Sequence, residues 1–199
     1  MIKRIMDLFA SILGIIVLSP FLIIISLAIK FTSKGPVFFK QERLGKDGET
    51  FKIIKFRTMI DKAEEVGMGI KTSANDPRIT KVGNLLRKTS LDELPQLFNV
   101  VVGNMSIVGP RPPVPYHPRE YKNYSEHQVQ RFKVKPGITG YAQVKGRNLL
   151  TWDERIEYDI EYVNKQTILL DIKIIMLTII KVFKKEDINS GRNENRDAQ

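Results

Sequence analysis

The longest hydrophobic segment covers residues 8–29 and contains no charged side chain. At 1.5 Å per residue, about 22 residues of α-helix are long enough to cross the hydrocarbon core of a bilayer. Ser19 and Pro20 interrupt the segment near its middle, where a proline removes one backbone hydrogen bond and bends a helix. The serine hydroxyl can donate to the carbonyl that the proline leaves without a donor. The pattern therefore predicts a membrane helix broken at Ser19 and Pro20.

Basic residues flank this segment on both sides, Lys3 and Arg4 before it and Lys30 and Lys34 after it. The positive-inside tendency favours the cytoplasmic side for each of them. A straight span places the two groups on opposite sides, whereas a re-entrant helix returns both to the same face. The sequence alone is consistent with either a re-entrant helix over residues 1–31 or a kinked span. A cleaved signal peptide is disfavoured, because the apolar run is longer than a typical h-region.

Shorter patterns follow the apolar helix. Residues 37–41 are typical of a short strand, residues 51–57 alternate apolar and basic side chains, and the turn residues 45–48 lie between them. This arrangement predicts a small β-hairpin. Residues 61–77 mix glycine, proline and charged side chains, which favours a short helix followed by a loop.

An acidic pair, Asp92 and Glu93, precedes Pro95. Ser90 and Glu93 have the spacing of a capping box, and proline is tolerated only in the first turn of a helix. The pattern therefore predicts a helix from about Asp92 to Gly103. Both carboxylates would lie at the positive end of its dipole, where ionised forms are favoured.

The C-terminal part is predicted to be helical. A second capping box, Thr151 to Glu154, opens a helix with an apolar stripe, and residues 167–185 form a strongly apolar segment interrupted by lysines. Those lysines favour an interfacial amphipathic helix over a second span. Residues 186–199 are polar and are expected to be a disordered tail. The predicted fold class is α+β, mainly helical, with a kinked N-terminal membrane helix and one β-hairpin.

Charge and composition limit the chemistry. Lys and Arg outnumber Asp and Glu by 32 to 22, and the formal charge of +10 favours anionic partners such as lipid, diphosphate or nucleic acid. The sequence contains no cysteine, which excludes disulfides, thiolate zinc sites and a cysteine nucleophile. It also lacks the Walker loop, the dinucleotide-binding glycine motif and the HExxH zinc motif.

Basic turns lie on both sides of the acidic pair. Arg87 precedes it, and three prolines around Arg111 fix the local backbone and could aim the guanidinium at a phosphate. The glycines of residues 133–140 could let the backbone approach an anion, and residues 145–148 extend the basic surface. Each motif alone also fits an ordinary helix start or a solvated surface loop.

Six segments in this order resemble the bacterial sugar transferase family of small monotopic polyprenyl-phosphate phosphoglycosyl transferases. They run along nearly the whole chain, which makes a chance resemblance improbable. The segments are Ser19-Pro20, 55–59, 90–97, 109–112, 135–140 and 146–148.

The resemblance implies transfer of a sugar 1-phosphate from a UDP-sugar to polyprenyl (undecaprenyl) phosphate, with release of UMP, as the first membrane step of glycoconjugate assembly. It implies that Asp92 is the nucleophile, forming a phosphosugar-aspartyl intermediate, and that Glu93 binds Mg²⁺. It also implies that residues 32–185 form a cytoplasmic catalytic domain, monotopic on the bacterial inner membrane. The expected phosphate- or nucleotide-binding residues are Lys55, Arg57, Arg87, Pro110, Arg111, Pro112, Gly137, Thr139 and Arg147.

Two other classes of function compete with this one. A non-catalytic basic protein could bind anionic membrane surfaces through the hydrophobic segments. A membrane-tethered nucleic-acid binder is disfavoured, because the basic residues lie within turns rather than along one helix face. The sequence names neither the sugar nor the glycoconjugate pathway, leaves a homodimer open, and gives no role to Asp159, which matches a family acidic position, or to residues 67–77.

Overall fold

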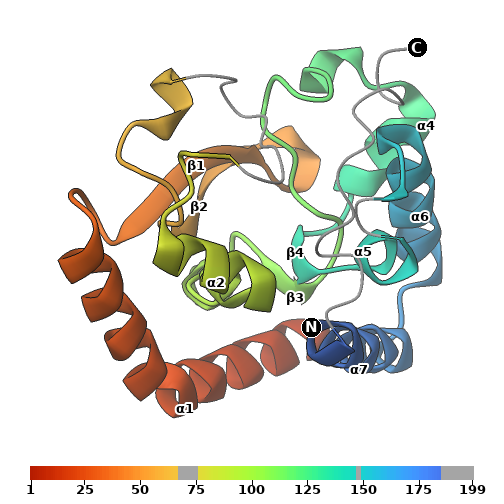
Figure 1. Cartoon of the computed structure of the whole chain (residues 1–199). Helices are drawn as coiled ribbons and strands as arrows, with labels where there is room; N and C mark the ends of the chain where they lie inside the picture. The colour runs from red at the N-terminus through yellow and green to blue at the C-terminus, as the bar shows by residue number, and fades with distance from the viewer. Residues whose placement is uncertain (67–75, 147–148, 185–199) are drawn as a thin grey trace.

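The computed structural model of the chain describes residues 1–66, 76–146 and 149–184. Its first helix, α1 (Ile2–Thr32), is long and apolar enough to cross a membrane, and it bends near its middle (Figure 1). Pro20 lies inside the helix and cannot donate to the carbonyl of Ile16. The Ser19 hydroxyl donates to that carbonyl instead, at 2.8 Å. The predicted interruption at Ser19 and Pro20 is therefore a bend in a continuous helix.

The N-terminal end of α1 is tied to the rest of the protein. The Arg4 guanidinium donates to the backbone carbonyls of Val100 and Val101, at 2.6 and 3.0 Å. Buried Asp7 accepts a hydrogen bond from the Ser106 hydroxyl at 2.7 Å. These contacts hold the first two turns of α1 against segments about a hundred residues further along the chain.

The C-terminal end of α1 is tied to the same body by Arg57. This buried guanidinium donates to the Ser33 carbonyl at 3.0 Å and hydroxyl at 2.8 Å, and also to the carbonyl of Lys34. Ile29, near the end of the helix, packs with Phe56 and Leu86 in one of the core clusters. Both ends of α1 therefore contact one folded body, while its middle is exposed.

The predicted hairpin is confirmed. Strands β1 (Phe38–Leu44) and β2 (Thr50–Phe56) pair antiparallel, with Phe38 opposite Phe56. The side chain of Asn99 occupies the other edge of β2, because it accepts from the Ile54 amide at 2.9 Å and donates to the Lys52 carbonyl at 2.8 Å. The side-chain amide thus makes the pair of hydrogen bonds that a neighbouring strand would make. It fixes β2 against the helix that carries Asn99.

Helices α2 (Lys81–Thr89) and α3 (Gln96–Val102) flank the acidic pair, which lies in a 3₁₀ turn (Leu91–Glu93). Helical backbone begins at Leu91, close to the predicted start near Asp92, but its first residues form a 3₁₀ turn and the α-helix begins at Gln96. The predicted capping box at Ser90 is wrong. Ser90 has a φ of 57° and its side chain makes no capping hydrogen bond. The Glu93 carboxylate is engaged by cations from other segments, so it is not available to cap the helix.

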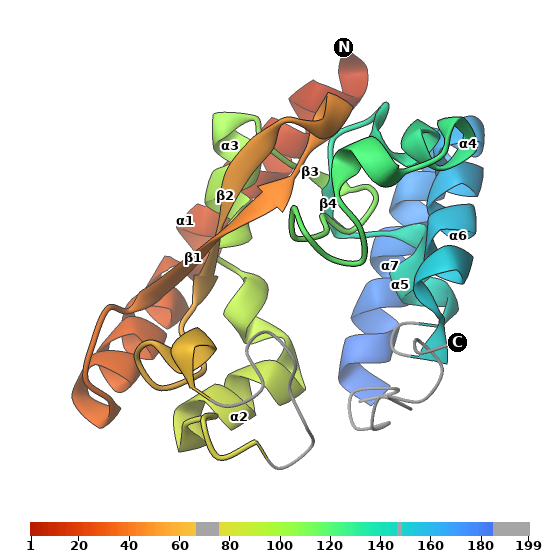
Figure 2. The same cartoon turned by 90° about the horizontal axis from the view of Figure 1, so that it is seen from above.

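A second sheet was not foreseen. Strands β3 (Ser106–Val108) and β4 (Gly137–Thr139) pair in parallel between the two halves of the molecule seen in Figure 2. The backbones lie so close together that a Cβ on Gly137 would be 2.1 Å from the amide nitrogen of Gly109. Part of the segment predicted as an anion-binding turn, Gly137–Thr139, is thus a strand.

The remaining helices form the second half of the molecule. Thr151 and Glu154 form the predicted capping box, and Ile156 and Ile160 pack into a cluster with Leu44 of β1. The helices there are α4 (Glu126–Val129), α5 (Tyr141–Lys145), α6 (Trp152–Lys165) and α7 (Ile168–Lys184). The further 3₁₀ turns are Lys46–Gly48, Ala63–Glu65, Tyr121–Asn123 and Gln130–Phe132.

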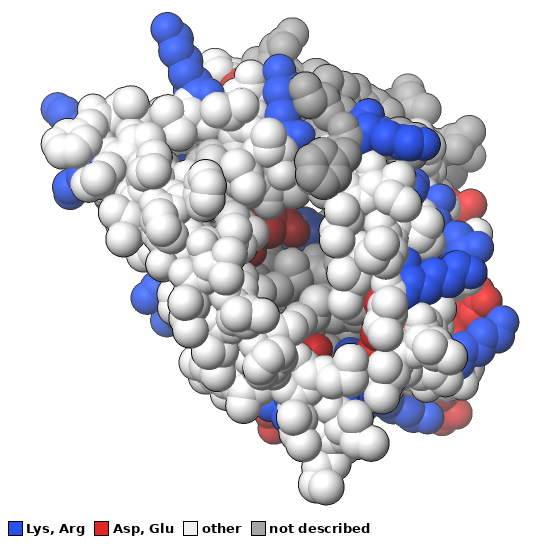
Figure 3. Space-filling view, turned by 90° about the horizontal axis from the view of Figure 1, so that it is seen from below, with Lys and Arg blue, Asp and Glu red and all other residues white. Residues whose placement is uncertain are grey.

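Helices α1 and α7 lie along one side of the molecule (Figure 1). Seen from that side, the surface is almost free of charged side chains, basic side chains gather at its rim, and acidic atoms are visible in a central hollow (Figure 3). The exposed apolar side chains of these two helices include Ile12, Ile16, Phe21, Ile24, Leu169, Ile172 and Met176.

Gly83 is the point where α2 packs most closely against the segment that follows β2. A Cβ at Gly83 would lie 1.9 Å from the carbonyl oxygen of Thr58, so Gly83→Ala should destabilise the protein although alanine is the better helix former. Because the close contact is with backbone, we expect an overpacking cost of about 3 kcal/mol, and after a propensity gain of about 1 kcal/mol the net of about 2 kcal/mol should lower the Tm by roughly 4–8 °C. Asn84→Ala, at an exposed position of the same helix, is the control and should not lower it. Equal Tm values in detergent for the two variants would contradict this packing.

Candidate active site

The centre of the candidate site is the carboxylate of Glu93. Its Oε1 accepts from the Lys55 ammonium at 2.7 Å and from both terminal nitrogens of Arg111 at 3.2 and 3.3 Å. Lys55 comes from β2, Glu93 from the 3₁₀ turn and Arg111 from the loop after β3. One carboxylate oxygen therefore joins three segments that are distant in the sequence.

Asp92 lies in the same turn but has a different electrostatic environment. Burial and the neighbouring charge of Glu93 raise the pKa of Asp92 to about 6, against the opposing charges of Lys55, Arg87 and Arg111. Burial alone would also raise the pKa of Glu93, but the charges of Lys55 and Arg111 outweigh it and lower that pKa to about 2. Adjacent carboxyl groups with pKa values on opposite sides of their ordinary range are typical of acids with different tasks.

Arg87 is held on the α2 side of the site. Its Nε donates to the Thr58 hydroxyl at 2.8 Å, and its terminal nitrogens have no hydrogen-bond partner in the described part of the chain. Its charge lowers the pKa of Asp92. Arg87, Lys55 and Arg111 thus place three cations around the acidic pair. The sequence predicted these three residues as phosphate- or nucleotide-binding, and the structure places them side by side at the acidic pair.

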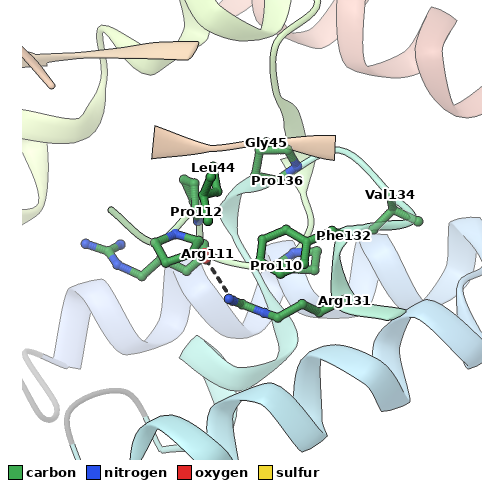
Figure 4. Close-up of a pocket in the computed structure, with 10 residues that line it drawn as sticks. Leu44, Gly45, Pro110, Arg111, Pro112, Arg131, Phe132, Val134 and Pro136 are labelled. Atoms are coloured by element: carbon green, nitrogen blue, oxygen red, sulfur yellow. Dashed lines mark hydrogen bonds between the residues drawn. The ribbon is translucent and has the colours of Figure 1, made fainter. Parts of the chain in front are cut away.

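The proline loop that carries Arg111 is fixed through its backbone. Four consecutive carbonyls, those of residues 110–113, each accept a hydrogen bond. Figure 4 shows the Arg111 side chain pointing away from the small cavity beneath the loop, which Pro110, Pro112 and Phe132 help to line. The donors, in order along the loop, are the Gly137 amide, the Arg131 side chain, the Arg43 side chain and the Leu44 amide.

A buried ion pair supports this loop. Arg131 and Asp159 are each 2% exposed, and the Arg131 nitrogens Nε and Nη2 donate to Asp159 Oδ2 at 3.1 and 2.6 Å. The same Nη2 donates to the Arg111 carbonyl at 2.9 Å. Asp159 therefore acts through Arg131 to hold the backbone of Arg111. Its match to a family acidic position thus has a structural explanation.

Other predicted binding residues have internal partners. Arg57 is buried and binds the end of α1, the Gly137 amide donates to Pro110, and the Thr139 hydroxyl lies 2.6 Å from that of Thr178. The expected anion cradle is therefore not formed by that amide, and Arg57 serves as a link to α1. Arg147 lies outside the described residues.

The acidic pair is the candidate site for Mg²⁺. Within the described residues no cluster of three or more His, Cys, Asp or Glu side chains is present. Mg²⁺ usually requires only one or two carboxylates together with substrate phosphates and water. The three hydrogen bonds to Glu93 all use Oε1, so Oε2 has no partner among the described residues. Glu93 therefore fits a magnesium ligand in a complex with a diphosphate.

Sequence reasoning missed Arg131, Thr58 and Asn99. Arg131 lies in an unremarkable segment, Gln130–Phe132, and only its contact with Asp159 reveals its role. The acidic side chain of Asp159 at a buried position of α6 was the one available signal, because a buried carboxylate requires a cationic or hydrogen-bonding partner.

The chain is similar to known proteins over most of its length. The model of the bacterial sugar transferase family matches residues 1–185. The UDP-glucose:undecaprenyl-phosphate glucose-1-phosphate transferase of Escherichia coli is 46% identical over 188 residues, covering 92% of this chain and 40% of the relative. The enzyme of the same name from Klebsiella pneumoniae is 48% identical, covering 91% of this chain and 40% of the relative.

A relative of similar length is also found. The "uncharacterized sugar transferase EpsL" of Bacillus subtilis is 43% identical over 188 residues, covering 94% of this chain and 90% of the relative. The chain thus spans about 40% of the two transferases named first and most of the third protein.

The support given by Asp159 can be tested by removing one partner or both partners of the buried ion pair. Asp159→Asn should cost about 3–5 kcal/mol, because it leaves the Arg131 charge buried without a carboxylate. Replacing both, as Arg131→Met with Asp159→Leu, should recover most of this loss, because an apolar pair of similar volume has no charge to desolvate. Glu161→Gln, which breaks only a partly exposed pair on the same helix, is the control and should change stability by less than about 0.5 kcal/mol. Thermal unfolding in detergent measures the wild type and the three variants, and a double variant at least as destabilised as Asp159→Asn would contradict the buried pair.

Proposed function

Because the chain belongs to the bacterial sugar transferase family, we propose that it transfers a sugar 1-phosphate from a UDP-sugar to polyprenyl phosphate. The observation that carries the proposal is the pairing of Asp92 with a Glu93 that is neutralised by Lys55 and Arg111. The names of the Escherichia coli and Klebsiella pneumoniae relatives support UDP-glucose as the first donor to test.

Asp92 is the proposed nucleophile. A carboxylate oxygen attacks the β-phosphorus of the UDP-sugar, the bond from that phosphorus to the bridging oxygen breaks, and UMP leaves with the bonding electron pair. An oxygen of polyprenyl phosphate then attacks the same phosphorus and releases the Asp92 carboxylate. The product is a polyprenyl diphosphate sugar. Two steps at one nucleophile allow the soluble donor and the lipid acceptor to react in turn.

The cations around Asp92 make this attack feasible. A carboxylate that approaches a diphosphate meets like charge, and the ammonium of Lys55 and the guanidinium groups of Arg87 and Arg111 offset it. Glu93 would hold Mg²⁺, which when bound neutralises phosphoryl oxygens. Glu93 is suited to this role because its low pKa keeps it ionised.

The contacts of α1 support a re-entrant topology. Arg4 at one end and Ser33 at the other both bind residues of the folded body, so a straight span would pull one end away from it. A helix that enters one leaflet and returns keeps both sets of contacts and exposes its apolar middle to lipid. By the positive-inside tendency, the body would then lie on the cytoplasmic face of the membrane.

Turnover is tested by UMP release from a panel of UDP-sugars, with Mg²⁺ and undecaprenyl phosphate, using the full chain in nanodiscs. Asp92→Asn should lower the rate by at least about 10³-fold, because an amide is a poor nucleophile. Removal of Mg²⁺ by EDTA should abolish release and addition of excess Mg²⁺ should restore it. Asp153→Asn, at an exposed carboxylate of α6, is the matched control and should keep the wild-type rate.

Two results would contradict this function. Wild-type turnover by Asp92→Asn would remove the nucleophile from the proposal. Silence of the folded wild-type chain across the panel would favour a non-catalytic protein that binds anionic membrane surfaces.

The topology is tested by single cysteines, which are clean probes because the native sequence contains none. Ile2→Cys and Lys34→Cys should both react with a membrane-impermeant maleimide from the cytoplasmic side only. Phe21→Cys, in the exposed apolar middle of α1, should be protected from either side. Labelling of the two end positions from opposite sides would establish a span and overturn the re-entrant helix.

A further inference from the structure

Helix α7 has a second surface feature beside its lipid-facing stripe. A groove with a volume of about 250 Å³ lies between α5 and α7. Its lining residues are Tyr141, Val144, Lys145, Leu170, Lys173, Ile174 and Leu177. None of them belongs to the cluster around Asp92, so this groove is separate from the candidate active site.

The groove combines apolar walls with two cations. Lys145 and Lys173 are exposed, and neither forms an ion pair with a carboxylate in the described part of the chain. The Lys145 ammonium lies 5.1 Å from the centre of the Tyr141 ring, which places it over the groove wall. Two uncompensated ammonium groups beside an apolar trough are complementary to an anion that carries a hydrocarbon chain.

The position of Lys173 connects the groove to the apolar surface. At 100° per residue, Lys173 lies between the exposed stripe marked by Leu169 and Met176 and the groove wall formed by Leu170 and Leu177. A lipid in the leaflet that contacts the stripe can therefore reach the groove without leaving the membrane. The volume is below the roughly 300–1,000 Å³ of pockets that enclose a drug-sized ligand, so only part of one lipid enters it.

We infer that this groove binds an anionic phospholipid of the surrounding leaflet. The headgroup phosphate lies between the ammonium groups of Lys145 and Lys173, and the first part of one acyl chain packs against Leu170, Ile174 and Leu177. The bound lipid fastens α7 to the bilayer surface. This inference rests on the membrane placement proposed above but not on the sugar-transfer chemistry.

The test is native mass spectrometry of the full chain released from detergent micelles. The lipids offered are phosphatidylglycerol, phosphatidylcholine with identical acyl chains, and undecaprenyl phosphate, each in a separate sample. The wild type should retain one phosphatidylglycerol at least tenfold more than phosphatidylcholine. Lys145→Gln with Lys173→Gln should abolish that preference, whereas Lys145→Arg with Lys173→Arg should keep it.

The matched control removes two exposed lysines elsewhere, as Lys40→Gln with Lys122→Gln, and should bind like the wild type. Equal retention of the two phospholipids by the wild type, or an unchanged preference in the double glutamine variant at unchanged Tm, would overturn the inference. Loss of undecaprenyl phosphate alone in that variant would also overturn it, by assigning the groove to the acceptor. The readout is binding, so its failure would not bear on turnover.

Discussion

The shared carboxylate of Glu93 is the interaction on which the site depends. It brings an ammonium from the hairpin and a guanidinium from the proline loop within 2.7 and 3.2 Å of one oxygen atom. Without it, Lys55 and Arg111 would repel one another beside Asp92 at a half-buried position, where an unpaired charge is costly. The same carboxylate sets the contrast between the pKa values of the acidic pair, because its negative charge raises that of Asp92. The pairing of the Glu93 carboxylate with Lys55 and Arg111 therefore determines how the hairpin, the 3₁₀ turn and the proline loop are arranged.

The surroundings hold this arrangement through the backbone more than through the reacting side chains. Arg131, which is paired with Asp159, donates to the Arg111 carbonyl from one half of the molecule. Asn99 fixes β2, and with it Lys55, against α3. All three supporting residues are almost fully buried. Arg131 and Asn99 bond directly to main-chain groups, and Asp159 acts through Arg131. Such support restricts the positions that the cations around Asp92 can adopt, which is the preorganisation that electrostatic stabilisation of a phosphoryl group requires.

Features determined by neighbours in the sequence were predicted well. The bond from Ser19 to the carbonyl of Ile16 and the capping box at Thr151 involve residues three positions apart. Ser90 has the same spacing to Glu93 as Thr151 has to Glu154, yet it makes no cap. The difference is that Lys55 and Arg111, from distant segments, bind the Glu93 carboxylate. Sequence patterns for a cap contain no information about such competing partners.

The same limit applies to the site residues. The resemblance to a family predicted one site containing the acidic pair, Lys55, Arg87 and Arg111. In the structure these residues lie together. Arg57 and Gly137 were expected at a phosphate but have internal partners. A basic side chain and a glycine amide can serve packing or binding equally well, and only the tertiary structure distinguishes the two. Arg131 was missed for the same reason, since its importance comes from a carboxylate 28 positions away.

The central claim is that Asp92 becomes covalently bonded to phosphorus during the reaction. The most direct measurement is the intact mass of the full chain after incubation with its UDP-sugar and Mg²⁺ in the absence of polyprenyl phosphate. The account predicts a mass increase of one sugar phosphate, located by peptide mapping to Asp92 and lost when polyprenyl phosphate is added. Turnover without any adduct, with UMP released only when the acceptor is present, would contradict it and indicate direct transfer between the two substrates.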